Sequence, residues 1–152
     1  MHLLEAKKYS QLSGEINSLY HEAAVIMGIS DSVLDILYVI CGAEDSCLQS
    51  EIYKMTGMSR QTINSAIHKL EKEGIVCLLQ GQGRNTIVSL TEKGKEFSSP
   101  KIHALQEIEN KIWSEWSIDE RQQYLTLTEK YCSSLRKYMK EIFRNNYPKE
   151  QL

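Results

Sequence analysis

Three observations on the 152-residue sequence predict a mainly helical α+β fold. Only two prolines and eight glycines are available to break regular elements, which favours long helices over a sandwich of many short strands. Apolar residues recur at spacings of three and four across most of the chain, as in amphipathic helices. The pattern changes at residues 75–90, where two aliphatic runs flank a polar loop with glycines, which predicts a β-hairpin.

The length and composition fit one ordinary globular domain over residues 1–152, with 41% apolar and 25% charged residues. No apolar run approaches the roughly 18 residues that span a bilayer, and residues 1–10 lack the apolar core of a signal peptide. We therefore expect a cytoplasmic protein with no membrane partner.

The first elements are predicted to be two helices. An apolar stripe over residues 12–27 lies within a first helix of about residues 3–28. Ser30 is a predicted N-cap for a second helix, which ends near Gly42. Residues 43–47 are predicted to be a connecting loop.

Two short helices are predicted next. The first covers residues 48–55, and Gly57 follows where a tight turn would lie. Ser59 caps the second, which runs to about Glu73. Gly74 then supplies the left-handed residue that commonly ends a helix.

After the hairpin, the helical pattern returns at Thr91. Residues 98–100 (Ser-Ser-Pro) predict a bend or a restart, because proline is tolerated in a first turn but not in a helix interior. Residues 117–120 form an S-x-x-E capping box, which predicts a last helix that runs to about Tyr147 before Pro148.

Helices at both ends carry more apolar surface than one small central module covers. The last helix is close to 30 residues long, well above the average of about 11 to 12. Its stripe repeats at three and four: Tyr124, Leu127, Tyr131, Leu135, Tyr138 and Ile142. We therefore interpret about residues 3–28 and 100–147 as dimerisation helices of a homodimer.

The central segment, about residues 30–95, has the element order of a winged helix-turn-helix, which places its second helix in the DNA major groove. At 100° per residue, one face of that helix is apolar: Ile63, Ala66, Ile67 and Leu70. The opposite face and its flanks carry amides, hydroxyls and cations: Gln61, Thr62, Asn64, Ser65, His68, Lys69 and Lys72. These groups match what base edges and phosphates require, so double-stranded DNA is the predicted partner.

The charge distribution agrees with this interpretation. The whole chain has a net charge of −2. The segment from Lys54 to Lys95 contains seven lysines and arginines but only three glutamates, so its local charge is +4. Arg84 lies in the hairpin loop, between Gly83 and Asn85, and the glycines at 81 and 83 keep the tip slim. An arginine there is expected to enter a DNA minor groove.

An ordered set of motifs resembles the multiple antibiotic resistance regulator (MarR) family of bacterial transcription factors. The motifs are S-R-Q-T at 59–62, L-E-K-E-G-I at 70–75, Arg84 and L-T-E-K-G at 90–94. The resemblance implies a homodimer with interlocked terminal helices that binds a pseudo-palindromic operator and acts as a repressor. It further implies that a small ligand, commonly phenolic, or thiol oxidation lowers the affinity for DNA.

Site residues follow from the resemblance by position. Base-facing residues would be Gln61, Thr62, Asn64, Ser65 and His68, and contacts to phosphates or the minor groove would come from Ser59, Arg60, Lys69 and Arg84. The family's ligand cleft would be lined by Tyr20, Met27, Tyr38 and Cys41. One departure is Gln82, where the family usually has an acidic residue that pairs with the wing arginine.

Alternatives to a ligand-responsive DNA-binding regulator remain open at this stage. A thiol-based redox sensor would use a cysteine of this chain, and a winged-helix module that binds protein would expose an apolar or acidic second helix. An enzyme would need a nucleophile, base or metal constellation, and the sequence has no G-x-S-x-G, H-E-x-x-H or P-loop motif. The four cysteines and four histidines show no ligand spacing, so neither a metal nor a cofactor is expected.

Overall fold

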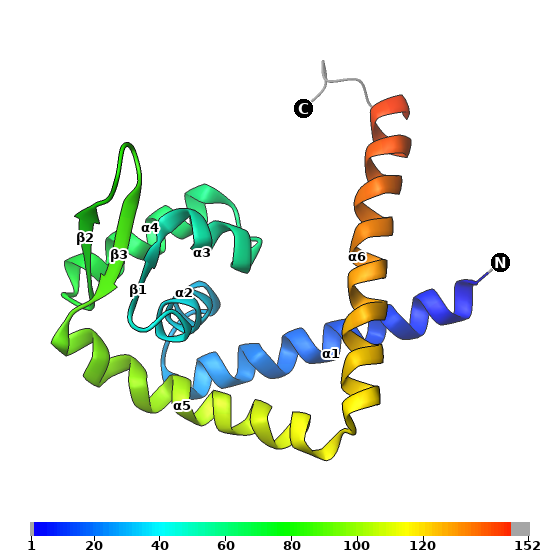
Figure 1. The fold of residues 1–152 in the computed structure, drawn as a ribbon, viewed down its shortest axis with the longest axis horizontal. Helices are drawn as coiled ribbons and strands as arrows, with labels where there is room; N and C mark the ends of the chain where they lie inside the picture. The colour runs from blue at the N-terminus through cyan, green and yellow to red at the C-terminus, as the bar shows by residue number, and fades with distance from the viewer. Residues whose placement is uncertain (1, 147–152) are drawn as a thin grey trace. The chain divides into compact units, whose positions relative to one another are not determined.

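The computed structural model describes residues 2–146, and side chains up to residue 144. In chain order the elements are α1 (Leu3–Met27), α2 (Asp31–Gly42), β1 (Ser46–Leu48), α3 (Gln49–Thr56), α4 (Arg60–Lys72), β2 (Val76–Gln80), β3 (Thr86–Leu90), α5 (Glu92–Glu115) and α6 (Ile118–Asn146) (Figure 1). The predicted α+β fold, mainly helical with a small antiparallel sheet, is confirmed.

The chain forms two compact units, and the boundary between them in the sequence falls within α5. The first runs up to Leu105 and holds the winged helix-turn-helix with α1, and the second begins at Gln106. Whether both unfold together, as one domain over residues 1–152, stays a prediction.

The helix boundaries follow from the capping residues that the sequence indicated. The hydroxyl oxygens of Ser30 and Ser59 accept hydrogen bonds from the backbone N–H groups of Val33 and Thr62, at 3.3 and 3.1 Å. Gly74 ends α4 in a left-handed conformation, with φ of 73°. The N-caps of α2 and α4 and the end of α4 are therefore confirmed.

A three-stranded antiparallel sheet has the order β1-β3-β2. The prediction of a loop over residues 43–47 is wrong at its end, because Ser46 begins strand β1 and pairs with Ser89 of β3. Two left-handed residues, Glu44 and Asp45, turn the chain back toward β3, and the Asp45 carbonyl accepts from the N–H of Leu90 at 2.9 Å. A strand of three residues is too short to show an alternating apolar pattern in the sequence, so only its pairing with β3 identifies it.

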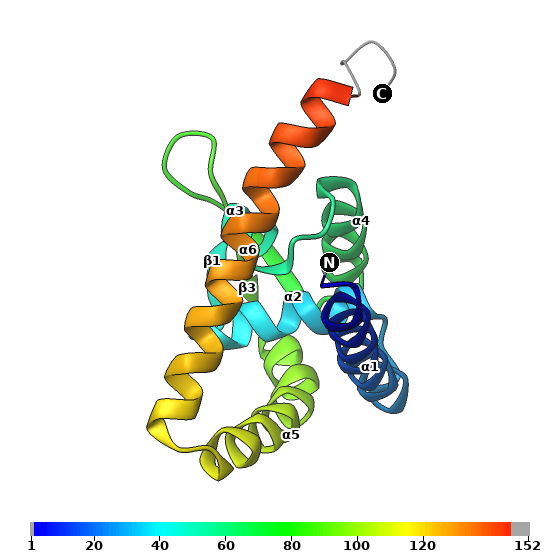
Figure 2. The same ribbon diagram turned by 90° about the vertical axis from the view of Figure 1, so that its right-hand side faces the viewer.

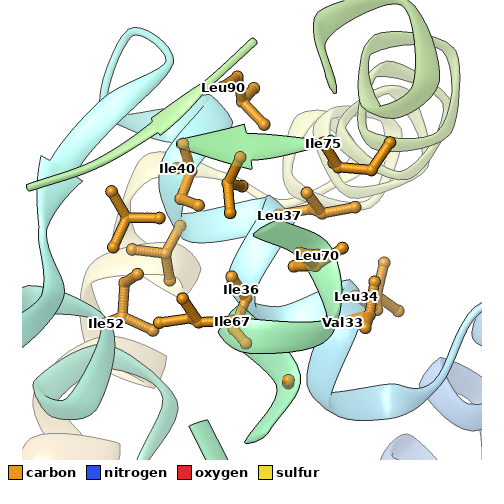
Figure 3. Close-up of a cluster of buried hydrophobic side chains, with 14 of the residues drawn as sticks. Val33, Leu34, Ile36, Leu37, Ile40, Ile52, Ile67, Leu70, Ile75 and Leu90 are labelled. Carbon is orange, nitrogen blue, oxygen red and sulfur yellow. The ribbon is translucent and has the colours of Figure 1, made fainter. Parts of the chain in front are cut away.

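The core of the first unit lies between α2, α3, α4 and the sheet. Ile36, Leu37 and Ile40 of α2, Ile52 of α3 and Ile67 of α4 belong to one cluster of buried side chains, and all five are at most 1% exposed (Figure 3). Because α4 is held along its whole apolar face, the orientation of its opposite face is fixed by this core.

Helix α5 runs unbroken through Pro100, so the predicted restart at residues 98–100 is wrong, and the alternative of a bend there stays a prediction. Pro100 has no N–H group to donate a hydrogen bond to the carbonyl of Glu96. Both residues are exposed, so water can reach that carbonyl. Ser98 and Ile102 on the other face are fully buried, and this packing outweighs the lost hydrogen bond.

The second unit contains the end of α5 and α6. The predicted capping box is confirmed, since the Glu120 N–H donates to the Ser117 hydroxyl at 3.2 Å and the Glu120 carboxylate accepts from the Ser117 N–H at 2.8 Å. Trp113, Trp116 and Tyr124 stack edge to face, with ring centroids 5.2 to 5.9 Å apart. The predicted end of α6 at about Tyr147 lies outside the described residues.

Within residues 2–146, no single helix is both long and apolar enough to cross a membrane. Only α1 and α2 taken together pass by length and composition, and they meet at 89°.

Candidate nucleic-acid interface

Helix α4 has the two faces that the sequence predicts. Ile63, Ala66, Ile67 and Leu70 are buried, while every predicted DNA-contacting residue on the helix is exposed: Arg60, Gln61, Thr62, Asn64, Ser65, His68 and Lys69. The division of α4 into a core face and a polar, solvent-facing surface is therefore confirmed.

The first turn of α4 uses its own hydroxyls. The Ser59 oxygen caps the helix and lies 2.8 Å from the Thr62 hydroxyl. The free N–H groups of this turn form a positive helix end that suits a phosphate. Ser59 is thus first a structural cap, whatever it contacts in addition.

A polar network that the sequence did not reveal joins α3 to α4. Gln49 and Tyr53 are one turn apart on α3, and both donate hydrogen bonds to the side-chain oxygen of Asn64. The Gln49 amide also donates to the Tyr53 hydroxyl at 2.7 Å, and the Arg60 guanidinium lies 5.0 Å from the centre of the Tyr53 ring. The i, i+4 spacing of Gln49 and Tyr53 was the only available signal.

The C-terminal part of α4 carries charge. The His68 imidazole lies 3.6 Å from the Glu71 carboxylate, an ion pair when the imidazole is protonated. Lys69 and Lys72 occupy the last turn, where cations favour the helix dipole.

The hairpin between β2 and β3 forms a wing that extends away from the helices, with its tip loop projecting into solvent (Figure 2). Hydrogen bonds within the tip close it: Gly81 N–H donates to the Asn85 carbonyl at 2.8 Å, and the Gln80 amide donates to the Gly83 carbonyl at 2.7 Å. Arg84 is exposed at the turn. The Gln80 amide and the backbone thus hold the tip loop. They do so in a chain that has Gln82 where the resemblance implies an acidic residue paired with the wing arginine.

The base of the wing is held by the L-T-E-K-G motif. The Thr91 hydroxyl donates to the Gly74 carbonyl and accepts from the Gly94 N–H at 3.0 Å, so it joins the end of α4 to the start of α5. The Lys93 ammonium donates to the Glu73 carbonyl at 2.6 Å. A Cβ on Gly94 would lie 1.9 Å from the Ile75 carbonyl oxygen, so only glycine fits.

The four predicted ligand residues lie in two different settings, and their role in binding a ligand stays a prediction. Met27, Tyr38 and Cys41 pack against the buried core of the first unit. Tyr20 instead lines a shallow pocket of about 350 Å³ between α1 and α2. Its other lining residues are polar or acidic apart from Leu34, and include His21 and Asp31, which form a 2.9 Å ion pair when the imidazole is protonated.

Two cysteines of the first unit are poor thiolates. Burial raises the pKa of Cys41, whose thiol lies 3.5 Å from the Ser98 hydroxyl. Burial, with the nearby Glu51 charge, raises the pKa of Cys47 to about 11. Because the thiolate is the species that is oxidised, neither resembles a redox-sensing cysteine. Within residues 2–146, no three His, Cys, Asp or Glu side chains gather as metal ligands.

The fold and this surface define a winged helix-turn-helix, the class in which a helix and a hairpin loop meet nucleic acid. A family model described as MarR family matches residues 27–84, which cover α2 to the wing tip. The resemblance to the MarR family that the sequence motifs indicate is thereby confirmed. No curated protein matches the sequence.

Solved structures of similar fold bear similar descriptions. NMB1585, a MarR family regulator from Neisseria meningitidis, is 20% identical with a TM-score of 0.75, over 88% of this chain and 97% of that one. MepR of Staphylococcus aureus, solved in complex with DNA, is 19% identical with a TM-score of 0.65, over 86% and 96%.

A third relative was solved with a ligand. PcaV, a transcriptional regulator from Streptomyces coelicolor in complex with its natural ligand, is 16% identical with a TM-score of 0.61, over 82% of this chain and 91% of that one. Together these structures show that this chain has the fold of the MarR-family transcriptional regulators.

Proposed function

We propose that this protein is a homodimeric transcriptional repressor that binds a pseudo-palindromic DNA operator and releases it on binding a small ligand. The observation that carries the proposal is α4, whose apolar face is buried while its opposite face offers amides, hydroxyls and cations. A protein-binding module would instead expose an apolar or acidic face there. The proposal includes no enzymatic activity, cofactor or metal.

Each DNA-binding element has a distinct role. Gln61, Thr62, Asn64, Ser65 and His68 read base edges in the major groove, because the N-terminal part of a recognition helix meets the bases. Ser59, Arg60 and Lys69 contact phosphates. Arg84 enters the adjacent minor groove or contacts its phosphates.

The dimer is supported by apolar surface that one chain leaves uncovered. Helix α6 has no buried residue among its described side chains, and Ile118 is 71% exposed. On α1, Leu4 is 81% and Leu19 57% exposed. A second copy that covers these helices removes a patch that monomeric proteins rarely expose. Two-fold symmetry then places two α4 helices about one turn of DNA apart, and a protein across a promoter blocks transcription.

Selection of bound sequences from a randomised duplex pool tests the proposal. The expected result is a palindrome with half-sites roughly 34 to 36 Å apart, and an affinity that falls steeply with salt. Arg84→Ala should weaken all sequences alike and reduce the salt slope by about one unit, while Gln61→Ala should change the preferred base at one position. A chain that selects no sequence and shows no salt dependence would disprove the DNA-binding role.

The finer part of the proposal is a small aromatic ligand. Tyr20 supplies a ring and a hydroxyl in the pocket between α1 and α2, and Met27, Tyr38 and Cys41 pack against the core of the first unit. Such a ligand would bind one dimer conformation more tightly than the other. Its effect on DNA binding can be no larger than this difference in affinity between the DNA-binding conformation and the released one.

Operator binding in the presence of millimolar phenolic acids, salicylate among them, tests this part. A loss of affinity that Tyr20→Ala reduces supports it. No response to the phenolic panel, with a response to peroxide that Cys41→Ser abolishes, would replace the ligand with thiol control.

A further inference from the structure

Among the cations predicted to contact DNA, Arg60 differs in its surroundings from Lys69 and Arg84. Its guanidinium lies over the ring of Tyr53 on α3, 5.0 Å from the ring centre. Within the part of the chain that the structure describes, neither Lys69 nor Arg84 lies over a ring, and both are exposed. Arg60 is exposed as well, so the ring is what gives its side chain a preferred position.

The Tyr53 ring is itself held in place. It is half-buried and packs against the core of the first unit. Its hydroxyl is hydrogen-bonded to the side-chain amides of Gln49 and Asn64. These contacts fix the ring whichever of the three groups donates the hydrogen bonds. Arg60 therefore lies over a surface whose position the fold determines.

The charge of Arg60 has no acidic partner. Its guanidinium forms no ion pair with any carboxylate whose side chain is described, and the first turn of α4 contains no acidic residue. Each of the other helices within residues 2–146 has at least one acidic residue in its first turn. A cation near the positive end of a helix is unfavourable for that helix. An anion that approaches the start of α4 would remove this cost.

A guanidinium over an aromatic ring can still bind a phosphate. The ring attracts the cation through its face, and the guanidinium keeps a planar set of N–H donors that matches phosphate oxygens. A side chain that moves freely before binding loses rotamer freedom when it binds, which lowers the affinity. A ring that already restricts the side chain removes part of this loss.

We propose that Tyr53 is a positioning residue that holds the Arg60 guanidinium for contact with a DNA phosphate at the start of α4. Tyr53 acts through Arg60 and touches no DNA itself. This inference rests on the proposed function and adds to it a residue of α3. Because a phosphate contact carries no sequence information, the effect should be the same on all DNA sequences.

Double-mutant cycles of DNA affinity test this role, with a duplex selected from the randomised pool and a duplex of unrelated sequence as probes. Tyr53→Leu removes the ring and the hydroxyl, whereas Tyr53→Phe removes only the hydroxyl. Tyr53→Leu is combined with Arg60→Ala and, as a matched control, with Arg84→Ala. Circular dichroism and the unfolding midpoint establish that each variant is folded. If Tyr53→Leu does not fold, Tyr53→Met removes the ring in its place.

Tyr53→Leu should weaken binding to both duplexes by roughly two- to fivefold, the effect of one exposed contact between a cation and a ring. The dependence of affinity on salt should stay the same, because the Arg60 charge remains, whereas Arg60→Ala should reduce the salt slope by about one unit. Tyr53→Phe keeps the ring and should recover the wild-type affinity for the unrelated duplex.

The two cycles should differ. In the Arg60→Ala background, Tyr53→Leu should cause no further loss of affinity, because the group through which the ring acts is absent. In the Arg84→Ala background, the separate losses should multiply, since Arg84 has no contact with the ring. A ring that only stabilised the fold would give multiplying losses in both cycles.

Three results would overturn the inference and leave the proposed function intact. The first is a wild-type affinity of Tyr53→Leu for both duplexes. The second is a loss in Tyr53→Leu that persists in the Arg60→Ala background. The third is an equal loss in Tyr53→Phe and Tyr53→Leu on the unrelated duplex, which would assign the effect to the hydroxyl. If the wild type binds neither duplex, the proposed function fails and the inference fails with it.

Discussion

The two compact units of this chain are both helical, yet they bury their apolar residues very differently. The first encloses Ile36, Leu37, Ile52 and Ile63 at 0% exposure, whereas α6 has no buried residue among those described. Periodicity alone does not reveal this contrast, since apolar stripes mark both units. The first unit therefore carries its own core, whereas the apolar stripe of α6 stays exposed in the single chain.

The largest expected effect tests the core of the first unit. Gly94→Ala places a Cβ 1.9 Å from the Ile75 carbonyl oxygen, a backbone atom that no side-chain movement relieves. We expect a loss of at least about 3 kcal/mol in the free energy of unfolding, at the upper end for overpacking. Urea unfolding followed by circular dichroism measures it.

A matched control exists in the same unit. Gly42→Ala is the same substitution in a helix, at a position where nothing lies within 4 Å of the added Cβ. It should leave stability unchanged or raise it by up to about 1 kcal/mol. Equal effects of the two substitutions would contradict the close approach at Gly94.

The second prediction tests the exposed apolar stripe of α6 in the second unit. Leu135→Glu places a charge in the apolar stripe of α6, and the dissociation constant of the dimer should rise roughly 30-fold or more. Sedimentation equilibrium measures it. Ser133→Glu, about 160° away from Leu135 around the same helix, should leave the dimer intact. If the wild type were already a stable monomer, the second unit would not need a partner.

The third prediction uses two cysteines as reporters, one for burial in the core of the first unit and one for burial at the expected dimer interface. Cys47 should react with iodoacetamide slowly in every folded variant, since a pKa of about 11 leaves roughly a hundredfold less thiolate than the ordinary value of 9.0. Cys132, exposed in the single chain and at the edge of the α6 stripe, should be protected in the dimer and react faster in Leu135→Glu. Rapid labelling of wild-type Cys132 would place this edge outside the interface.

The smallest effect concerns two carboxyl groups with opposite pKa changes. Burial and the charge of Asp31 raise the pKa of Asp35, so its ionised form destabilises the first unit and that cost disappears as pH falls. Hydrogen bonds from Ser117 lower the pKa of Glu120, so its contribution is present above the unfolded pKa and lost as pH falls through the folded one.

Asp35→Asn should therefore stabilise the protein slightly at pH 7, within about 0.5 kcal/mol, and have no effect near pH 3. Thermal unfolding at the two pH values measures this difference. Glu120→Gln should instead lower stability at pH 7. A larger gain from Asp35→Asn at pH 3 than at pH 7 would reverse the assigned sign.

Structural features are predicted best from the sequence when they depend on side chains that are close together along the chain. The N-caps Ser30 and Ser59, the capping box at Ser117 and the buried face of α4 all follow from side chains a few residues apart. Strand β1 and the unbroken α5 were missed because their causes lie far away in sequence. Ser46 pairs with Ser89, and Pro100 is tolerated because Ile102 on the opposite face is fully buried.

The candidate interface divides in the same way. The exposed polar residues of α4 and Arg84 were predicted from helical geometry and motif position. Gln49 and Tyr53 were not, because a hydrogen bond from α3 to Asn64 depends on how two helices cross. Met27 at the end of α1 and Tyr38 and Cys41 on α2 pack against the core of the first unit, and their role in binding a ligand stays a prediction.

The clamp of Thr91 and Lys93 on the carbonyls of Gly74 and Glu73 has a consequence for how such a chain tolerates insertions. It ties the two ends of the wing together below the strands, so the length of the tip is independent of the position of α4. Lengthening a flexible loop is inexpensive, about 0.6 kcal/mol for each doubling. The distance to which the wing tip extends is therefore a property that residues 81–85 can change while α4 stays where it is.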